Sequence, residues 1–324
     1  MLLSARMLGK LQGIEERYAQ LRYQKVAEIP MEFCDTNDYL VCEPVSMKWR
    51  RAKPGDLWGK PWTTRWFRGD FQIPVGYKGK KVFIHANVGS HDTLFFVDSA
   101  PWGVFDENHP VVLLTKSGVV GKSYHLALEG YSGHSYPGAH PHDNPRPMQP
   151  NSRTFSGVEA MLEREDVSAF VFDFRVLRQL QNALDSNSLR KHEIIKCLSK
   201  VFEIVDSIPN ETDESDWRPK LAEARKAMRP LLECRNGSTT PWFGVIGHSH
   251  LYTAWLWPLR EARRKAARTF SSVLNLMEQY PEMLFVQNVP CHSDMIAEDY
   301  PLLFKRVQSQ VRKGRWEPNG PMWV

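Results

Sequence analysis

The sequence contains little cysteine and no close cysteine pair. Its 324 residues hold five cysteines, which are scattered and show no Cys-x-x-Cys spacing. Neither a zinc ribbon nor a disulfide framework is therefore expected, and a reducing compartment is favoured. A long apolar run is also missing from the start of the chain, Met1 to Leu11. We therefore expect no signal peptide and no membrane span, and we take the cytoplasm as the location.

An excess of charge of one sign is missing as well. The 42 basic and 37 acidic residues leave a formal net charge of +5, and no long basic stripe alternates with aromatic residues. We therefore do not expect nucleic acid as a partner. The densest basic stretch, Arg260 to Arg268, falls in a predicted helix, where it is interpreted as a solvated face.

The pattern of apolar and polar residues changes along the chain and divides it into three regions, 1–150, 151–237 and 238–324. In the first, apolar residues recur at helical spacing from Ser4 to Gln24, which predicts one amphipathic helix. Short β-rich runs follow from about residue 39 to residue 130, separated by Gly, Pro, Asp and Asn. Many short strands at this spacing are typical of a β-sandwich, which we predict to be of the jelly-roll kind.

The second region is predicted to be a helical connector of three helices. In the third, a short apolar strand at Trp242–Ile246 precedes a helix from Pro258 to Tyr280 with one apolar stripe. A second strand at Met283–Gln287, a helix from about Ala297 to Arg312 and a third strand near Arg315 follow. This order predicts the opening of a parallel α/β domain. Two βα units cannot close a barrel, so we expect the domain to be incomplete over these residues.

The most specific chemical signal is the segment from His248 to Pro258, which reads His-Ser-His-Leu-Tyr-Thr-Ala-Trp-Leu-Trp-Pro. It lies where the first strand of the third region ends, and ligands collect at the carboxyl ends of strands in parallel α/β folds. In an extended chain His248, His250 and Tyr252 lie on the same side. Two imidazoles on one side suit a divalent metal, although hydrogen-bonded histidines in a polar core have the same spacing.

This segment resembles the start of the catalytic domain in α-mannosidases of glycoside hydrolase family 38. The family pattern is His-x-His-x-Asp-x-x-Trp, with Ala-Trp-Leu-Trp-Pro in the cytosolic and bacterial branch, and the latter block stands unchanged here. The resemblance continues through Ala267–Leu274 and Gly314–Pro318, and upstream through Trp62–Gly69 and Phe105–His109. It covers nearly all of the chain, as the amino-terminal portion of such an enzyme.

The resemblance implies a retaining hydrolase that removes terminal α-mannose from mannose-containing oligosaccharides. In such enzymes one carboxylate attacks the anomeric carbon, and a second, about 5 Å away, acts as acid and then base. The resemblance also implies a zinc or cobalt ion bound by the second histidine of the motif, here His250, and by an aspartate two residues later. That position holds Tyr252, a poor ligand for a hard divalent ion. The family's nucleophile and its other metal ligands correspond to positions beyond Val324.

By the same resemblance, His248 is expected to support the site rather than bind metal. Trp255 and Trp257 are expected to line the sugar subsite, with packing in a helix core as the alternative. The first interpretation is a truncated or degenerate α-mannosidase that is inactive alone. The second is a non-catalytic protein that binds carbohydrate or a partner, and the third is a remnant that does not fold beyond about residue 240. We also expect that a full-length form can be a homo-oligomer.

Overall fold

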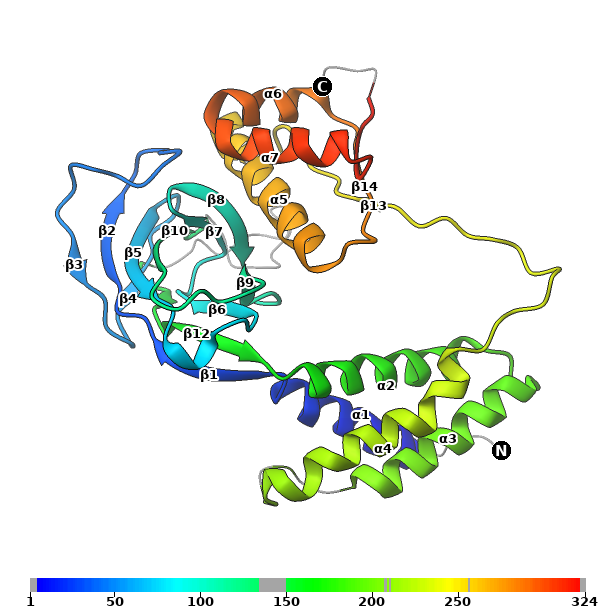
Figure 1. Cartoon of the computed structure of the whole chain (residues 1–324). Coiled ribbons are helices and arrows are strands. Elements are labelled where there is room, and N and C mark those ends of the chain that lie inside the picture. Colours follow the sequence, from blue (N-terminus) through cyan, green and yellow to red (C-terminus); the bar gives the residue numbers. More distant parts are fainter. Residues whose placement is uncertain (1–4, 134–149, 207–208, 210, 256, 321–324) are drawn as a thin grey trace. The chain divides into compact units, whose positions relative to one another are not determined.

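The computed structural model describes residues 5–133, 150–206, 209, 211–255 and 257–320. They form two compact units, each built from two separate stretches of chain (Figure 1). The helical unit comprises Met1–Gln24 and Leu162–Phe243, and the mixed unit comprises Lys25–Met161 and Gly244–Val324. None of the helices in the described residues has the length and apolar character that a membrane span requires.

The described residues of the helical unit form four helices around one apolar core: α1 (Ala5–Gln20), α2 (Glu165–Ala183), α3 (Leu189–Val205) and α4 (Glu214–Leu232). In this core the ring centroid of Tyr18 lies 5.2 Å from that of Phe170 and 5.7 Å from that of Trp217. We expected the first helix to reach Gln24 and to belong with the β-sandwich. Instead it ends at Gln20 and buries its apolar stripe against α2 and α3. The domain division at residues 150 and 237 stays a prediction.

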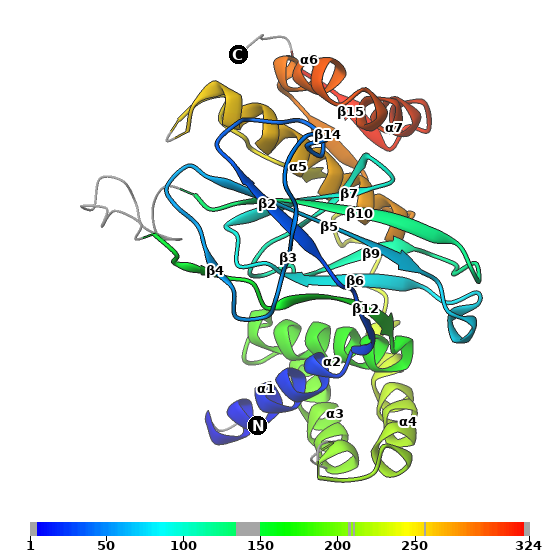
Figure 2. The same cartoon turned by 90° about the vertical axis from the view of Figure 1, so that its left-hand side faces the viewer.

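The β-sandwich predicted for the first region is present in the mixed unit as two layered sheets (Figure 2). The six-stranded sheet has the order β3-β2-β5-β10-β7-β8, and the four-stranded sheet has the order β1-β12-β6-β9. The central strand β10 pairs antiparallel with both β5 and β7. The bounds are β1 (Tyr23–Glu28), β2 (Glu32–Thr36), β3 (Arg50–Arg51), β5 (Thr64–Gln72), β6 (Val82–Asn87), β7 (Asp92–Val97), β8 (Ala100–Phe105), β9 (Val111–Thr115), β10 (Ser123–Tyr131) and β12 (Gly157–Glu163). Two short strands, β4 (Leu57–Trp58) and β11 (Arg153–Thr154), form a separate pair, and a 3-10 turn lies at Val75–Tyr77.

Both faces of the six-stranded sheet are buried. Successive residues of a strand point to opposite faces, so Trp66 and Phe67 of β5 enter different cores. On one face Phe67 stacks on Phe155, with ring centroids 5.2 Å apart. On the other face Trp66, Leu94 and Phe96 share a core with helix α5 (Leu259–Gln279). The runs of consecutive apolar residues in β5 and β7 follow from this double burial.

The third region has the predicted alternation of strands and helices. Its strands are parallel, with Gly247 opposite Phe285 and Phe285 opposite Trp316. Phe285 and Trp316 pack on the apolar stripe of α5, whose Phe270 ring lies 4.9 Å from that of Trp316. The bounds are β13 (Gly247–His248), β14 (Phe285–Gln287), α6 (Pro290–Asp299), α7 (Pro301–Arg312) and β15 (Trp316–Pro318).

Two predicted elements of this region are wrong in their bounds. The first strand is not at Trp242–Ile246, where the chain has no paired strand and is exposed, but at Gly247–His248. The single helix expected from Ala297 to Arg312 is two helices, α6 and α7, which meet at Tyr300. The cause is Pro301, which lacks an amide hydrogen and disfavours helical geometry in the residue before it. Tyr300 accordingly has φ −134°.

Candidate functional site

The motif segment follows β13 and begins at the carboxyl end of the parallel sheet, as predicted. His248 is the last residue of β13, and its Nε2 lies 3.0 Å from Oδ1 of Asn288, which follows β14. Farther along the motif, the hydroxyl of Thr253 lies 3.3 Å from Nε2 of His292 in α6. Burial lowers the pKa of His292, so this imidazole is neutral at pH 7. The motif is thus anchored from the neighbouring strand end and from a helix.

Three of the five predicted site residues form one aromatic cluster. The ring of Tyr252 stands edge-on between two neighbours, 4.5 Å from the His250 ring and 4.2 Å from the Trp255 ring, between centroids. All three side chains are solvent-exposed, with Tyr252 and Trp255 at 45% and 47% of their full surface. An exposed aromatic surface at a strand end suits stacking on a sugar ring. The core-packing alternative therefore does not describe Trp255.

The residues near His250 do not make up a metal site by themselves. Tyr252, in the position of the expected aspartate, offers a phenol, which is a poorer ligand for a hard divalent ion than a carboxylate is. Within the described part of the chain, no three or more His, Cys, Asp or Glu side chains gather closely enough to hold a metal ion. His250 therefore offers one exposed imidazole rather than a complete ligand set.

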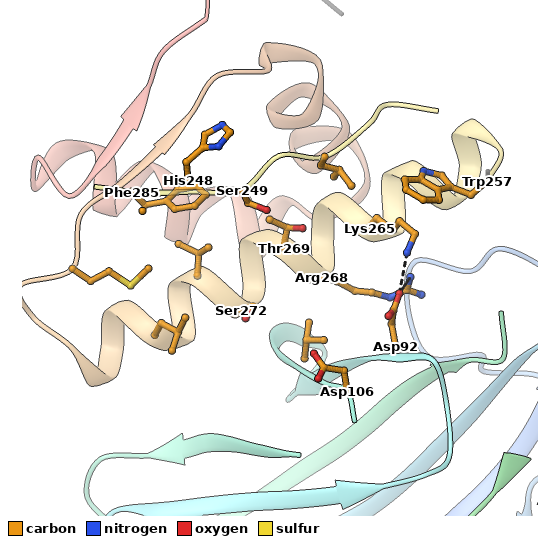
Figure 3. Close-up of a pocket in the computed structure, with 16 residues that line it drawn as sticks. Asp92, Asp106, His248, Ser249, Trp257, Lys265, Arg268, Thr269, Ser272 and Phe285 are labelled. Carbon is orange, nitrogen blue, oxygen red and sulfur yellow. Dashed lines mark hydrogen bonds and ion pairs between the residues drawn. The ribbon is translucent and has the colours of Figure 1, made fainter. Parts of the chain in front are cut away.

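Trp257 lies apart from this cluster. The ammonium of Lys265 sits 4.8 Å from the centroid of its indole ring, and its indole nitrogen is buried without a hydrogen-bond partner among the described residues. Trp257 lines a cavity of about 470 Å³, which we call the α5 pocket (Figure 3). His248, Ser249 and Leu251 line the same pocket, whereas His250 and Tyr252 do not. Some side chains of the motif therefore line the α5 pocket, and others form the exposed aromatic cluster.

The walls of the α5 pocket come from the sandwich and from the start of the α/β region. Asp92 of β7 and Asp106, which follows β8, face residues of α5 in Figure 3. One oxygen of the Asp92 carboxylate accepts from Lys265 at 3.0 Å and from Arg268 at 3.4 Å. Burial alone raises the pKa of Asp92, but the charges of Arg268 and Lys265 outweigh burial and lower it to about 2.

Behind the pocket wall lies a cluster of buried charges, which corrects the prediction of a solvated basic face. Arg264 and Arg268 are only 1% and 4% exposed. The guanidinium of Arg268 lies 3.0 Å from the carboxylate of Glu129 on β10 and also bonds Glu261. Burial disfavours the charged form of Arg268, but Glu129 and Glu261 raise its pKa well above the usual value. This part of the basic stretch is a contact surface with the sandwich.

Sequence reasoning found the motif but missed the α5 pocket and the charge cluster. Their members from the sandwich lie far away along the chain, since Glu129 precedes Arg268 by 139 positions. One available signal was the pairing of Glu261 with Arg264 and Arg268, three and seven residues on, which puts all three side chains on one helix face. Another was Glu129, which directly follows the apolar residues Leu126, Ala127 and Leu128 in β10.

Two family models match the chain. The model described as "Alpha-mannosidase, jelly roll domain" matches residues 25–155, and the one described as "Glycosyl hydrolases family 38 N-terminal domain" matches residues 243–324. These stretches contain the sandwich and the α/β region with the motif, respectively.

Curated relatives match over most of this chain. Human "Alpha-mannosidase 2C1" is 26% identical over 300 residues, which cover 87% of this chain and 27% of the relative. "Alpha-mannosidase G" of Dictyostelium discoideum is 22% identical over 292 residues, covering 87% of this chain and 26% of the relative. The chain thus spans about a quarter of the length of these relatives. Among solved structures, a β-glucuronidase from Ruminococcus gnavus has a TM-score of 0.31 at 11% identity, over 44% of this chain and 29% of that one.

Proposed function

This chain belongs to glycosyl hydrolase family 38, as an amino-terminal portion, and from that premise we propose that it takes part in the hydrolysis of terminal α-mannosides. The substrates would be mannose-containing oligosaccharides. The observation that carries the proposal is the exposed cluster of His250, Tyr252 and Trp255 beside the carboxyl end of β13. Because the matched region is 27% of the human relative, the reaction is proposed for a longer protein and not for these residues alone.

Each residue of the cluster has a proposed task. Trp255 offers its exposed ring to the apolar face of a sugar. Tyr252 holds that ring edge-on and offers a hydroxyl to a sugar oxygen. His248, tied to Asn288, positions the start of the motif. Retaining hydrolysis requires two carboxylates about 5 Å apart, and the cluster contains none, so its proposed work is binding and orientation.

A divalent zinc or cobalt ion is proposed as the cofactor, with His250 as one ligand. When bound, such an ion polarises oxygen atoms of the substrate and stabilises developing charge. The assay measures zinc uptake by a chimera in which these residues replace the matched region of human Alpha-mannosidase 2C1, so that the ligands which the resemblance places beyond Val324 are supplied. In the chimera, His250→Ala is expected to lower zinc uptake. His248→Ala, which removes the neighbouring imidazole, is the matched control and is expected to keep uptake. Equal uptake by the unchanged chimera and by His250→Ala contradicts the ligand role.

The hydrolase proposal is tested with a chimera in which these residues replace the matched region of human Alpha-mannosidase 2C1. We expect the chimera to release p-nitrophenol from p-nitrophenyl α-D-mannoside, and Tyr252→Asp to increase the rate because it restores an anionic ligand. The 324-residue chain alone is expected to release none. A folded chimera that is inactive both with Tyr252 and with Tyr252→Asp overturns the proposal.

A second candidate function is carbohydrate binding without turnover. The observation that favours it is the Tyr252–Trp255 pair, an exposed aromatic surface at a position where the family pattern has a carboxylate. Binding of methyl α-mannoside that is weakened by Trp255→Ala, together with an inactive chimera, would support this function over hydrolysis.

A cytoplasmic location and homo-oligomerisation of a longer form are also proposals. None of the five cysteines, all of which lie in the described residues, is in a disulfide bond, which fits a reducing compartment. Light scattering of a longer form would test the oligomer.

A further inference from the structure

The α5 pocket is separate from the His250 cluster. Figure 3 shows His248 pointing away from the hydroxyl of Ser249, which points toward α5. His248, Ser249 and Leu251 line the pocket, whereas His250, Tyr252 and Trp255 do not. A ligand in this pocket would therefore contact the start of the motif and not the Tyr252–Trp255 surface.

The pocket contains polar groups that the protein leaves without partners. Thr269 and Ser272 lie one turn apart on α5, and Ser249 lies across from them (Figure 3). Within the described part of the chain, none of these three hydroxyls takes part in a hydrogen bond. Hydroxyls that line a cavity without a partner are available to a ligand.

The charged groups around the pocket, by contrast, already have partners. Asp92 is paired with Lys265 and Arg268. Asp106 accepts backbone N–H groups from Asn108 at 2.7 Å and from His109 at 2.8 Å. A charged ligand would have to break one of these pairs or remain unpaired in a partly buried site, which is costly. The ligand chemistry that fits is neutral.

The remaining lining is apolar and consists of residues such as Leu251, Val273 and Phe285, in addition to the indole of Trp257. A cavity of about 470 Å³ with an apolar wall and a few convergent hydroxyls is typical of a small-molecule site. Sugars combine hydroxyl edges with apolar ring faces. We propose that the α5 pocket binds a neutral sugar of one or two rings, as an accessory site separate from the His250 cluster. The choice of mannosides as probes rests on the proposed function.

The test measures binding of methyl α-D-mannoside and of α-1,2-mannobiose to the whole chain by isothermal titration. Thr269→Val and Ser272→Val together remove two hydroxyls from the pocket, and we expect binding to weaken at least about tenfold. Ser271→Ala is the matched control, because its hydroxyl is buried and unpaired one residue away but does not line the pocket. It is expected to leave binding unchanged. Circular dichroism checks that each variant is folded.

The opposite results overturn the accessory site. Binding that survives Thr269→Val with Ser272→Val but is lost in Trp255→Ala places the sugar on the His250 cluster, and the α5 pocket is then wrong while the proposed function stands. No binding of either probe at millimolar concentration also overturns it. The hydrolysis assay of the chimera reports on the proposed function independently, so the two failures are distinguishable.

Discussion

The helical unit and the mixed unit bury different kinds of side chains. The core of α1 to α4 consists of apolar and aromatic residues such as Phe170 and Leu198. Its ion pairs lie outside this core, either exposed, as Arg218–Asp166 is, or at its edge, where Glu15 is buried against Arg178. The mixed unit encloses Arg268 and Glu129 between its six-stranded sheet and α5. Apolar packing tolerates many arrangements of similar volume, whereas a buried ion pair is favourable only when both partners are in place. We therefore expect the charge cluster to fix how α5 sits on the sandwich.

The largest effect is expected from breaking the cluster. Arg268→Met leaves the buried Glu129 and Glu261 with Arg264, at 3.3 Å and 3.8 Å, as their remaining arginine partner, and is expected to cost about 3 to 5 kcal/mol of unfolding free energy. Urea unfolding of the mixed unit measures the loss. The double change Glu129→Leu with Arg268→Met removes charges of both signs and is expected to lose less than Arg268→Met alone. Exposed ion pairs contribute less than about 1 kcal/mol. If Arg268→Met lowered the unfolding free energy by no more than that, the buried cluster would not differ from an exposed pair.

Truncating an apolar side chain in the core of the helical unit provides the comparison with the charge cluster. Leu198 is fully buried among α1 to α4, and Leu198→Ala is expected to cost about 3 kcal/mol through lost burial and a residual cavity. Leu198→Met, which conserves volume, is expected to cost under about 1.5 kcal/mol. If Leu198→Met were as harmful as Leu198→Ala, the helical core would be as specific as the charge cluster, and the contrast would fail.

The smallest effect is expected at an exposed charge cluster of the mixed unit. His125 of β10 lies 2.8 Å from Asp70 and 2.7 Å from Glu43. Burial lowers the pKa of His125, but these two carboxylates outweigh it and raise the pKa above 6.5. The stabilisation is therefore complete below pH 6.5 and is lost as pH rises through the folded-state pKa. The Tm difference between the unchanged chain and His125→Gln should shrink between pH 5.5 and 8, and a constant difference would exclude the linkage.

Local patterns predicted much of the fold. Period-two runs indicated the sandwich strands, and the apolar stripe of α5 indicated a helix that covers a core. The Tyr300–Pro301 break is readable in the sequence, because proline disfavours a helix at the preceding residue, and the prediction of one helix from Ala297 to Arg312 does not take it into account. Trp242–Ile246 has strand composition, yet composition does not reveal whether a neighbouring strand is there to pair with it.

The candidate site was predictable only in its local part. The motif order placed His250, Tyr252 and Trp255 within a few residues of each other, and the structure brings their rings together. Asp92 and Arg268 are 176 residues apart, so no local pattern relates them. The burial of the basic stretch of α5 could not be predicted from local sequence, because Glu129 and Asp92, which pair with Arg268, belong to the sandwich.

The double burial of the six-stranded sheet has a consequence for how the protein is made. Trp66, Leu94 and Phe96 leave the ribosome long before the helix that covers them. Arg268 is translated 176 residues after Asp92, which at about 5 to 20 residues per second takes about 9 to 35 s. During that interval one face of the nascent sheet is an uncovered aromatic surface. This protein is therefore expected to depend on chaperones during synthesis until α5 emerges.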